Sequence, residues 1–442
     1  MAGSRQTVVI EITGLTSAGD GVGRWQGLTV FVPGALPEET VEACLTQIKK
    51  NYARAELRKI IRAADSRLVP ACPVYTACGG CGLQHLAYGR QLQWKRQWLI
   101  DALQRIGGLD IEVLPTLPAP APFFYRDRAQ LHALWQDDQL RLGFYKRGSK
   151  EGEAIPHCAL MSGSLNQLTQ SLTESLQNSV NEWRGLRHVA IRCDSAGEKV
   201  MLVLLGIPYS KALHRAAQGL MAEIPQLFSV WANWGRPLCG IYGDNWRNLA
   251  GEDRLPDHFA GLKLEISPGA FTQVNSAQAE RLYECVADYA ALSGGETLLD
   301  IYSGSGIIAL YLARRVQQAI GVEEYAPAVQ DAARNAALNG LDNCRFKTGR
   351  AEKILPRLAR QGLKADVAVV DPPRAGCAAT VVEALAAIKP RRIVYVSCDP
   401  ATLARDLRLF AEHGYAAQKA QPLDMFPQTG HVESICLLSK KV

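Results

Sequence analysis

The sequence predicts an α/β protein of three regions: a small β-barrel, a mixed α+β middle region and a C-terminal domain built on a parallel sheet. Its 442 residues exceed the roughly 100–200 residues of one domain. Short β-branched runs separated by Gly, Asp and Pro fill the first 65 or so residues, and regular alternation of strand and helix patterns begins near Leu262. We therefore expect domains at residues 1–65, 66–261 and 262–442.

The composition is that of an ordinary globular protein, with 48% hydrophobic and 21% charged residues, which excludes a mainly disordered or collagen-like chain. No apolar stretch is long enough to span a bilayer, and the first residues lack the apolar core of a signal peptide. We therefore expect a cytoplasmic protein with no membrane partner. The net charge of +6 permits an anionic partner without requiring one, and nothing implies an obligate protein partner.

The first region has the pattern of an OB-like barrel, a fold that often carries oligonucleotides. Gly21 and Gly23 stand where a hairpin needs positive φ, and Pro33-Gly34 marks the next corner. The segment from Lys49 to Arg62 holds six basic residues and one acid. It is equally consistent with a solvated basic face and with contact to an anionic partner.

The middle region mixes polar helices with paired strands. The expected helices lie near Arg90–Ile106, Ser162–Trp183 and Lys211–Ala222, and the expected strands are Arg126–Trp135, Leu140–Tyr145, His188–Cys193 and Lys199–Leu205.

From Leu262 onward, apolar strands alternate with amphipathic helices, which indicates a parallel sheet covered on both faces. Strand Thr297–Ile301, with Asp300 near its end, leads into the turn Tyr302-Ser-Gly-Ser-Gly306 and then a helix. Glu323 ends the next strand about 20 residues later, where an acid can hold ribose hydroxyls. This pattern resembles that of Rossmann-like, S-adenosylmethionine-binding methyltransferases. The alternative is a structural glycine turn with a surface Glu.

A later strand ends in Asp371-Pro-Pro-Arg374, which places a carboxylate at the mouth of the same crevice unless it merely opens a proline-rich turn. Enzymes that methylate amino groups have an aromatic ring at the position of Arg374, so that chemistry is disfavoured.

Strand Arg392–Ser397 delivers Cys398 directly before the start of a helix. Backbone N–H dipoles at a helix N-terminus favour a thiolate, whereas an unperturbed thiol is only about 3% ionised at pH 7. We therefore expect Cys398 to be a nucleophile with a favoured thiolate, and the alternative is a buried structural cysteine. His431 and Glu433 are general-base candidates if they lie in the crevice, although alone they would be a turn residue and a strand-edge carboxylate.

Cys72, Cys78 and Cys81 fall within ten residues around a Gly-Gly pair. Because no export signal is seen, the twelve cysteines should be reduced, and this clustering indicates a metal or iron–sulfur site. We expect a [4Fe–4S] cluster. Zinc is the alternative, for which His85 or His157 would suit as a ligand.

Three motifs closely resemble those of the RNA 5-methyluridine methyltransferases, and the match is closer to the 23S rRNA branch than to the tRNA branch. They are Asp371-Pro-Pro-Arg-Ala-Gly, Val396-Ser-Cys398-Asp-Pro-Ala-Thr-Leu-Ala-Arg405-Asp and Gly430-His-Val-Glu433-Ser. The resemblance implies a TRAM domain for the first region and an iron–sulfur site for the cysteine cluster.

The resemblance also implies residue roles. Cys398 would attack carbon-6 of uracil, Glu433 would remove the carbon-5 proton, and Phe271 matches a ring near the target base. Ile307 and Arg350 depart from the family's usual Asn, so no cofactor contact is transferred to them. The expected cofactor contacts are Gln273, Tyr302, Gly304, Glu323 and Asp371, and the expected cluster ligands are Cys72, Cys78, Cys81 and Cys158.

We therefore expect an S-adenosylmethionine-dependent enzyme that methylates carbon-5 of a uridine in 23S rRNA. Arg126, Arg128 and the basic segment would hold the phosphate backbone. The alternatives are the same chemistry on tRNA and a non-catalytic iron–sulfur RNA-binding protein. The intact site residues argue against the second alternative.

Overall fold

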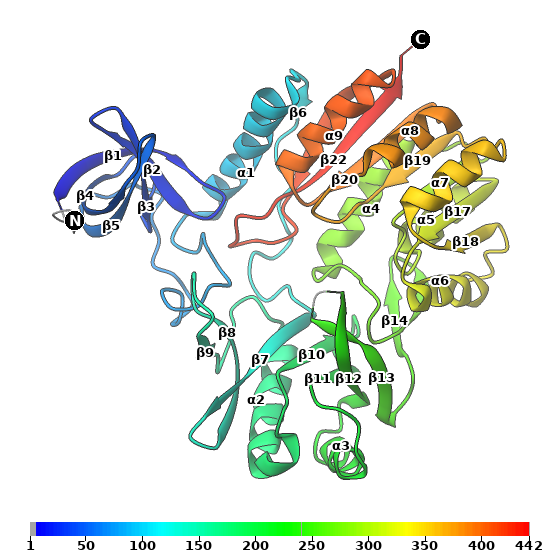
Figure 1. Cartoon of the computed structure of the whole chain (residues 1–442), viewed down its shortest axis with the longest axis horizontal. Coiled ribbons are helices and arrows are strands. Elements are labelled where there is room, and N and C mark those ends of the chain that lie inside the picture. Colours follow the sequence, from blue (N-terminus) through cyan, green and yellow to red (C-terminus); the bar gives the residue numbers. More distant parts are fainter. Residues whose placement is uncertain (1–5, 240, 442) are drawn as a thin grey trace.

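The structure is a computed structural model that describes residues 6–239 and 241–441. Figure 1 shows the N-terminal barrel in blue, the middle sheet and its helices in cyan to green, and the C-terminal α/β layers in yellow-green to red. None of the helices in these described residues is long and apolar enough to cross a membrane.

The first five strands close into a barrel in the order β1-β2-β3-β5-β4, as the sequence predicts. Strand β1 shows why: Val8, Ile10 and Ile12 are buried in the barrel core while the residues between them are exposed. Most of the basic segment forms β5, whose arginines and lysine are exposed. The strands are β1 (Thr7–Leu15), β2 (Asp20–Trp25), β3 (Leu28–Pro33), β4 (Thr40–Ile48) and β5 (Tyr52–Arg62).

A seven-stranded sheet in the order β13-β12-β11-β10-β7-β8-β9 forms the middle of the molecule. Two helices, α2 (Gly163–Asn178) and α3 (Lys211–Glu223), pack on one face of this sheet and bury a shared apolar core. The strands are β7 (Arg128–Gln136), β8 (Gln139–Tyr145), β9 (Gly152–Ala154), β10 (His188–Cys193), β11 (Val200–Leu205), β12 (Leu227–Cys239) and β13 (Tyr242–Gly251).

The C-terminal sheet has the order β18-β17-β16-β19-β20-β22-β21-β6. Its first five strands are parallel, and apolar cores lie on both of its faces, as the sequence predicts. The strands are β16 (Thr297–Ile301), β17 (Gln318–Glu323), β18 (Cys344–Thr348), β19 (Val367–Val370), β20 (Arg392–Ser397), β21 (Tyr415–Leu423), β22 (Glu433–Lys440) and β6 (Glu112–Val113). The helices are α4 (Ser276–Ala290), α5 (Ile307–Leu312), α6 (Ala326–Leu338), α7 (Ala351–Arg360), α8 (Ala379–Ile388) and α9 (Pro400–Glu412).

Two segments pack with this C-terminal sheet although they precede it in the chain. Helix α1 (Tyr88–Ala102), which ends in a π-helical turn (Leu103–Gly107), contributes Leu99 and Leu103 to the core under α9, and β6 pairs with β21. The hairpin of β14 (Leu255–Phe259) and β15 (Leu262–Ile266) packs against the other core. Figure 1 shows α1 beside α9. Two stretches that precede the C-terminal sheet in sequence, α1 with β6 and the β14–β15 hairpin, are therefore part of the C-terminal layers.

Candidate active site

The backbone of the turn after β16, residues 302–306, lies beside an open space. Tyr302, Gly304 and Gly306 all have positive φ, at 64°, 53° and 77°. A Cβ added to Gly306 would lie 2.7 Å from the Ala332 side chain, so only glycine fits beneath α6. Nothing lies within 4 Å of a Cβ added to Gly304, which leaves the space above it open.

Glu323, at the end of β17, holds this turn in place. Its Oε2 accepts a hydrogen bond from the backbone N–H of Gly304 at 3.0 Å, and its Oε1 accepts one from Tyr325 at 2.8 Å. A carboxylate therefore stands beside the open space over Gly304, at the strand position that the sequence predicts.

Two further carboxyl groups lie at the same sheet edge. Asp300 is fully buried, and its Oδ2 accepts a hydrogen bond from the N–H of Ala309 at 3.0 Å. Burial, together with the charges of Asp371 and Glu323, raises the pKa of Asp300 to about 7. Burial raises the pKa of Asp371 to about 6. This edge of the sheet therefore gathers three acids that would favour a cation.

Gln273 reaches this edge from the segment before α4. It lines a small cavity together with Tyr283 and Ile307, the first residue of α5. Arg350 lies farther along as the N-cap residue of α7, where its Nε is 3.4 Å from a carboxylate oxygen of Glu352. Ile307 and Arg350 are the two positions that depart from the family pattern. The first is an apolar residue at the start of a helix, and the second takes part in a surface ion pair.

Cys398 and Glu433 lie at the same end of neighbouring strands. Ser397, the last residue of β20, pairs with Ser434 of β22, so the residues next to this pair lie close together at this edge of the sheet. Burial and the charge of Asp371 raise the pKa of Glu433 to about 8, while the Arg374 guanidinium opposes the shift. The structure thus brings together the two residues to which the sequence assigns the chemistry.

The expectation of a favoured thiolate at Cys398 was wrong. Burial and the charge of Glu433 raise the pKa of the Cys398 thiol to about 11. The amides at the start of α9 do not compensate, because the Asp399 side chain accepts hydrogen bonds from Ala401 and Thr402 at 2.9 and 3.0 Å. The helix N-terminus is therefore capped by its own carboxylate.

The sequence pattern gave Arg374 no role beyond disfavouring amino-group chemistry, yet its guanidinium supplies positive charge to this site. Its positive charge favours the ionised forms of both Cys398 and Glu433. Its Nη2 lies 3.3 Å from Nδ1 of His431, and partial burial and this guanidinium lower the pKa of His431 to about 4. The signal that could have revealed Arg374 is its place three residues after a strand-end carboxylate.

The loop between β21 and β22, which precedes Glu433, is held by elements distant in sequence. The carbonyl oxygen of Gln428 accepts hydrogen bonds from the N–H groups of Gly82 and Leu83 at 3.1 and 3.0 Å. A Cβ added to Gly430 would lie only 1.5 Å from the carbonyl oxygen of Ser17 in the barrel. The barrel, the cysteine segment and this loop therefore meet backbone against backbone.

The four predicted cluster cysteines line one cavity of about 90 Å³. Burial raises the pKa of the thiols at positions 72, 78 and 81, and the charge of Cys158 raises it further. Within residues 6–239 and 241–441, no group of three or more His, Cys, Asp or Glu is arranged so that it could hold a metal ion. His85 bonds to Tyr75 and His157 packs on Phe124, and neither is among the described residues that line the cavity.

A larger cavity of about 490 Å³ lies beside the segment that carries Phe271, whose exposed fraction is 67%. Arg126, Arg128 and Arg192 also line it. Arg128 donates a hydrogen bond to Asp127 at 2.8 Å and another to the carbonyl oxygen of Thr272 at 2.7 Å. Part of its donor capacity is thus used within the protein.

Comparisons with known proteins agree with this geometry. A family model described as tRNA (Uracil-5-)-methyltransferase matches residues 260–441, and a TRAM domain model matches residues 2–57. An uncharacterised RNA methyltransferase of Listeria innocua is 38% identical over 99% of this chain and 98% of its own length. A second, from Clostridium tetani, is 38% identical over 98% of this chain and 96% of its own length.

Among solved structures, the tRNA (uracil-54, C5)-methyltransferase of Pyrococcus abyssi in complex with S-adenosyl-L-homocysteine is similar, with a TM-score of 0.74 and 27% identity. The similarity covers 98% of this chain and 100% of that one. The motifs, the strand-end site and these relatives lead to one conclusion: the chain belongs to the RNA (uracil-5-)-methyltransferase family, with a TRAM domain at its N-terminus.

Proposed function

We propose that this protein methylates carbon-5 of a uridine in 23S rRNA, with S-adenosylmethionine as methyl donor and a temporary bond between Cys398 and carbon-6 of the uracil. One observation carries the proposal. The thiol of Cys398 and the carboxyl group of Glu433, whose pKa is about 8, lie at adjacent strand ends of the sheet that also carries the glycine turn. Uracil carbon-5 is a poor nucleophile, and addition of sulfur at carbon-6 makes it electron-rich.

The residues of the crevice fit S-adenosylmethionine. Buried polar atoms at the glycine turn have no partner within the described residues, namely Oδ1 of Asp300 and the hydroxyls of Ser303 and Ser305. Glu323 and the open space over Gly304 lie beside them. When bound, the donor supplies a methyl group on a positively charged sulfur, which the three nearby carboxyl groups favour. Tyr302, Gln273 and Asp371 are the other proposed contacts.

Each step at the base is assigned to a residue of this chain. Cys398 reacts as the thiolate, its proton having passed to water, and its sulfur bonds to carbon-6 as the π bond between carbon-5 and carbon-6 opens, which places negative charge on the ring and makes carbon-5 nucleophilic. Arg374 favours the thiolate, as would a cationic donor. After methyl transfer carbon-5 carries both a methyl group and a hydrogen. Ionised Glu433 removes that proton, the carbon–sulfur bond breaks, and the thiolate is restored. A pKa of about 8 suits a proton acceptor near neutral pH.

A [4Fe–4S] cluster held by Cys72, Cys78, Cys81 and Cys158 is part of the proposal. It is supported by the single cavity that all four cysteines line and by the sulfur ligands that such a cluster takes. We assign the cluster a structural role. The reason is that Gly82 and Leu83, directly after Cys81, donate hydrogen bonds to the loop that leads to Glu433.

The choice of 23S rRNA is supported by the sequence motifs and by the cysteine cluster beside a TRAM domain. A specific observation favours a second candidate substrate, tRNA. The similar Pyrococcus abyssi enzyme is a tRNA methyltransferase, and the likeness covers 98% of this chain.

The deciding experiment is mass mapping of 5-methyluridine in 23S rRNA and tRNA from a strain that lacks this protein. Loss from 23S rRNA, restored by the purified protein and labelled S-adenosylmethionine, is the expected result. Loss from tRNA alone would assign the second candidate. Unchanged 5-methyluridine in both RNAs, with no label transferred, would leave a non-catalytic RNA-binding protein and overturn the proposal.

A further inference from the structure

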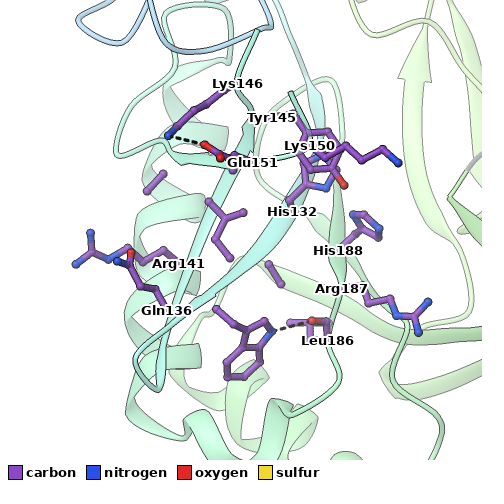
Figure 2. Close-up of a pocket in the computed structure, with 15 residues that line it drawn as sticks. His132, Gln136, Arg141, Tyr145, Lys146, Lys150, Glu151, Leu186, Arg187 and His188 are labelled. Carbon is purple, nitrogen blue, oxygen red and sulfur yellow. Dashed lines mark hydrogen bonds and ion pairs between the residues drawn. The ribbon is translucent and has the colours of Figure 1, made fainter. Parts of the chain in front are cut away.

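The face of the seven-stranded sheet opposite α2 and α3 carries aromatic and basic side chains. Leu131 and Val189 point into the helix-covered core, so the alternate residues His132 and His188, which pair across β7 and β10, point to the opposite face. A cavity of about 760 Å³ opens there, lined by both histidines (Figure 2).

The centre of this cavity is a stacked pair of rings. His132 and Tyr145 lie with centroids 3.7 Å apart and planes 28° apart, and His188 meets His132 edge-on at 4.8 Å. Gly143 stands directly opposite His132 in β8, where a Cβ would collide with the backbone of Glu153 and the side chain of Leu134, so no side chain from position 143 covers the rings. Tyr145 keeps an exposed fraction of 42%. Burial lowers the pKa of both histidines, which disfavours their charged forms.

Cations surround the rings. Arg141, Lys146, Lys150 and Arg187 line the cavity, and the only carboxylate among its described lining residues is Glu151, which pairs with Lys146 at 3.3 Å. Figure 2 shows Lys150 and Arg187 extending away from the sheet, to either side of His188. An aromatic platform with cations at its rim is an arrangement that binds single-stranded nucleic acid, because bases stack on the rings and phosphates pair with the cations.

The platform continues into the cavity beside Phe271. Gln130 and Ala190 line that second cavity, and each lies two residues from a histidine of the platform on the same strand and face. Arg126, at the far side of the second cavity, is close enough to His431 to lower its pKa. One face of the sheet therefore leads from the stacked rings toward the candidate active site.

We propose that the His132–Tyr145 stack binds an unpaired base of the RNA substrate, separate from the target uridine, while Lys150 and Arg187 contact its phosphates. The proposal rests on the proposed function, since it assigns to this face a segment of RNA that flanks the methylated position. The RNA substrate would then extend beyond the nucleotides that lie next to Cys398 and Glu433.

The test uses the full-length protein and two transcripts around the uridine identified by mass mapping, one with its flanking single-stranded nucleotides and one trimmed of them. Tyr145→Ala should weaken binding of the long transcript about 5- to 100-fold at fixed salt and raise KM with kcat unchanged. It should not change methylation of the trimmed transcript. Tyr145→Trp keeps a stacking ring and should restore affinity.

Tyr209→Ala is the matched control. Tyr209 is 40% exposed and lies over Arg247 on the helix-covered side of the same sheet. A Tyr145→Ala variant that binds and methylates the long transcript like the wild type would overturn the proposal and leave this face to another class of partner. An equal loss in Tyr209→Ala would overturn it as well. If the wild type methylates neither transcript, the failure lies in the proposed function.

Discussion

Lys95 donates a hydrogen bond to Asp424 at 2.5 Å, and both side chains have an exposed fraction of 0%. Lys95 belongs to α1, whereas Asp424 begins the loop between β21 and β22 that leads to Glu433. The same ammonium group donates to the carbonyl oxygen of Phe426 at 3.0 Å. One buried cation therefore fixes the start of the segment that carries the proposed base.

Lys95→Met should destabilise the protein by about 3–5 kcal/mol, because it leaves the Asp424 carboxylate buried without its charge partner. Urea unfolding measures the loss. Adding Asp424→Leu should restore most of the stability, since an apolar pair replaces the buried ions. The double variant should remain less active than the wild type, because Phe426 still lacks its hydrogen bond.

Arg90→Gln on the same helix is the control for that series. Arg90 pairs with Glu38 at the surface, where the side chains are 37% and 60% exposed, so the loss should stay below about 1 kcal/mol. Equal losses from Lys95→Met and Arg90→Gln would contradict the role given to the buried pair.

Cys398→Ala should abolish methylation and any covalent complex with RNA that contains 5-fluorouridine. Fluorine at carbon-5 cannot leave as a proton, so the wild type should remain bonded to such RNA after methyl transfer and migrate with it on a denaturing gel. Cys285→Ala is the matched control, because Cys285 lies on α4 and is partly buried, as Cys398 is. Full activity without residue 398 would remove the covalent mechanism.

Much of the site could be predicted because its parts are local. Strand β20 has the bounds expected from its apolar run, Arg392–Ser397, and Glu323 ends the strand after the glycine turn as the spacing indicates. Parallel strands bring their carboxyl ends to one edge, so strand-end residues far apart in the chain could be placed together from the sequence pattern alone.

The remainder depends on contacts that sequence order hides. The raised pKa of Cys398 arises from burial and from Glu433, 35 positions away in the sequence, which no local pattern reveals. Strand β12 was not predicted because Gly235 and Pro237 interrupt it, and the pairing register with β13 shifts there.

Glu433→Gln should trap a covalent adduct with ordinary substrate RNA, because the amide cannot accept the carbon-5 proton while Cys398 can still attack. The adduct should resist a denaturing gel and contain the transferred methyl label. If Glu433→Gln instead released free, fully methylated RNA at the rate of the wild type, another group would be the proton acceptor.

The same substitution should also change the pH dependence of stability. The folded protein raises the pKa of Glu433 from 4.5 to about 8, so the unfolded chain releases this proton at lower pH than the folded protein does. The wild type should therefore lose stability relative to Glu433→Gln as the pH rises from about 4.5 to about 8, with no further change above that range. Urea unfolding at pH 5, about 6.5 and about 8 measures the difference. The exposed Glu280→Gln on α4 is the control, and a trend of equal size there would contradict the assignment.

Gly430→Ala should separate the barrel from the loop that leads to Glu433. The new Cβ would lie 1.5 Å from the carbonyl oxygen of Ser17, so one of the two backbones must move. We expect a stability loss of about 1–3 kcal/mol from overpacking and a fall in kcat, because the displaced loop carries the proposed base. Gly219→Ala on α3 is the control, since a Cβ there meets nothing within 4 Å and should slightly stabilise the helix. If Gly430→Ala unfolds and methylates like the wild type, the contact between barrel and loop has no part in positioning Glu433.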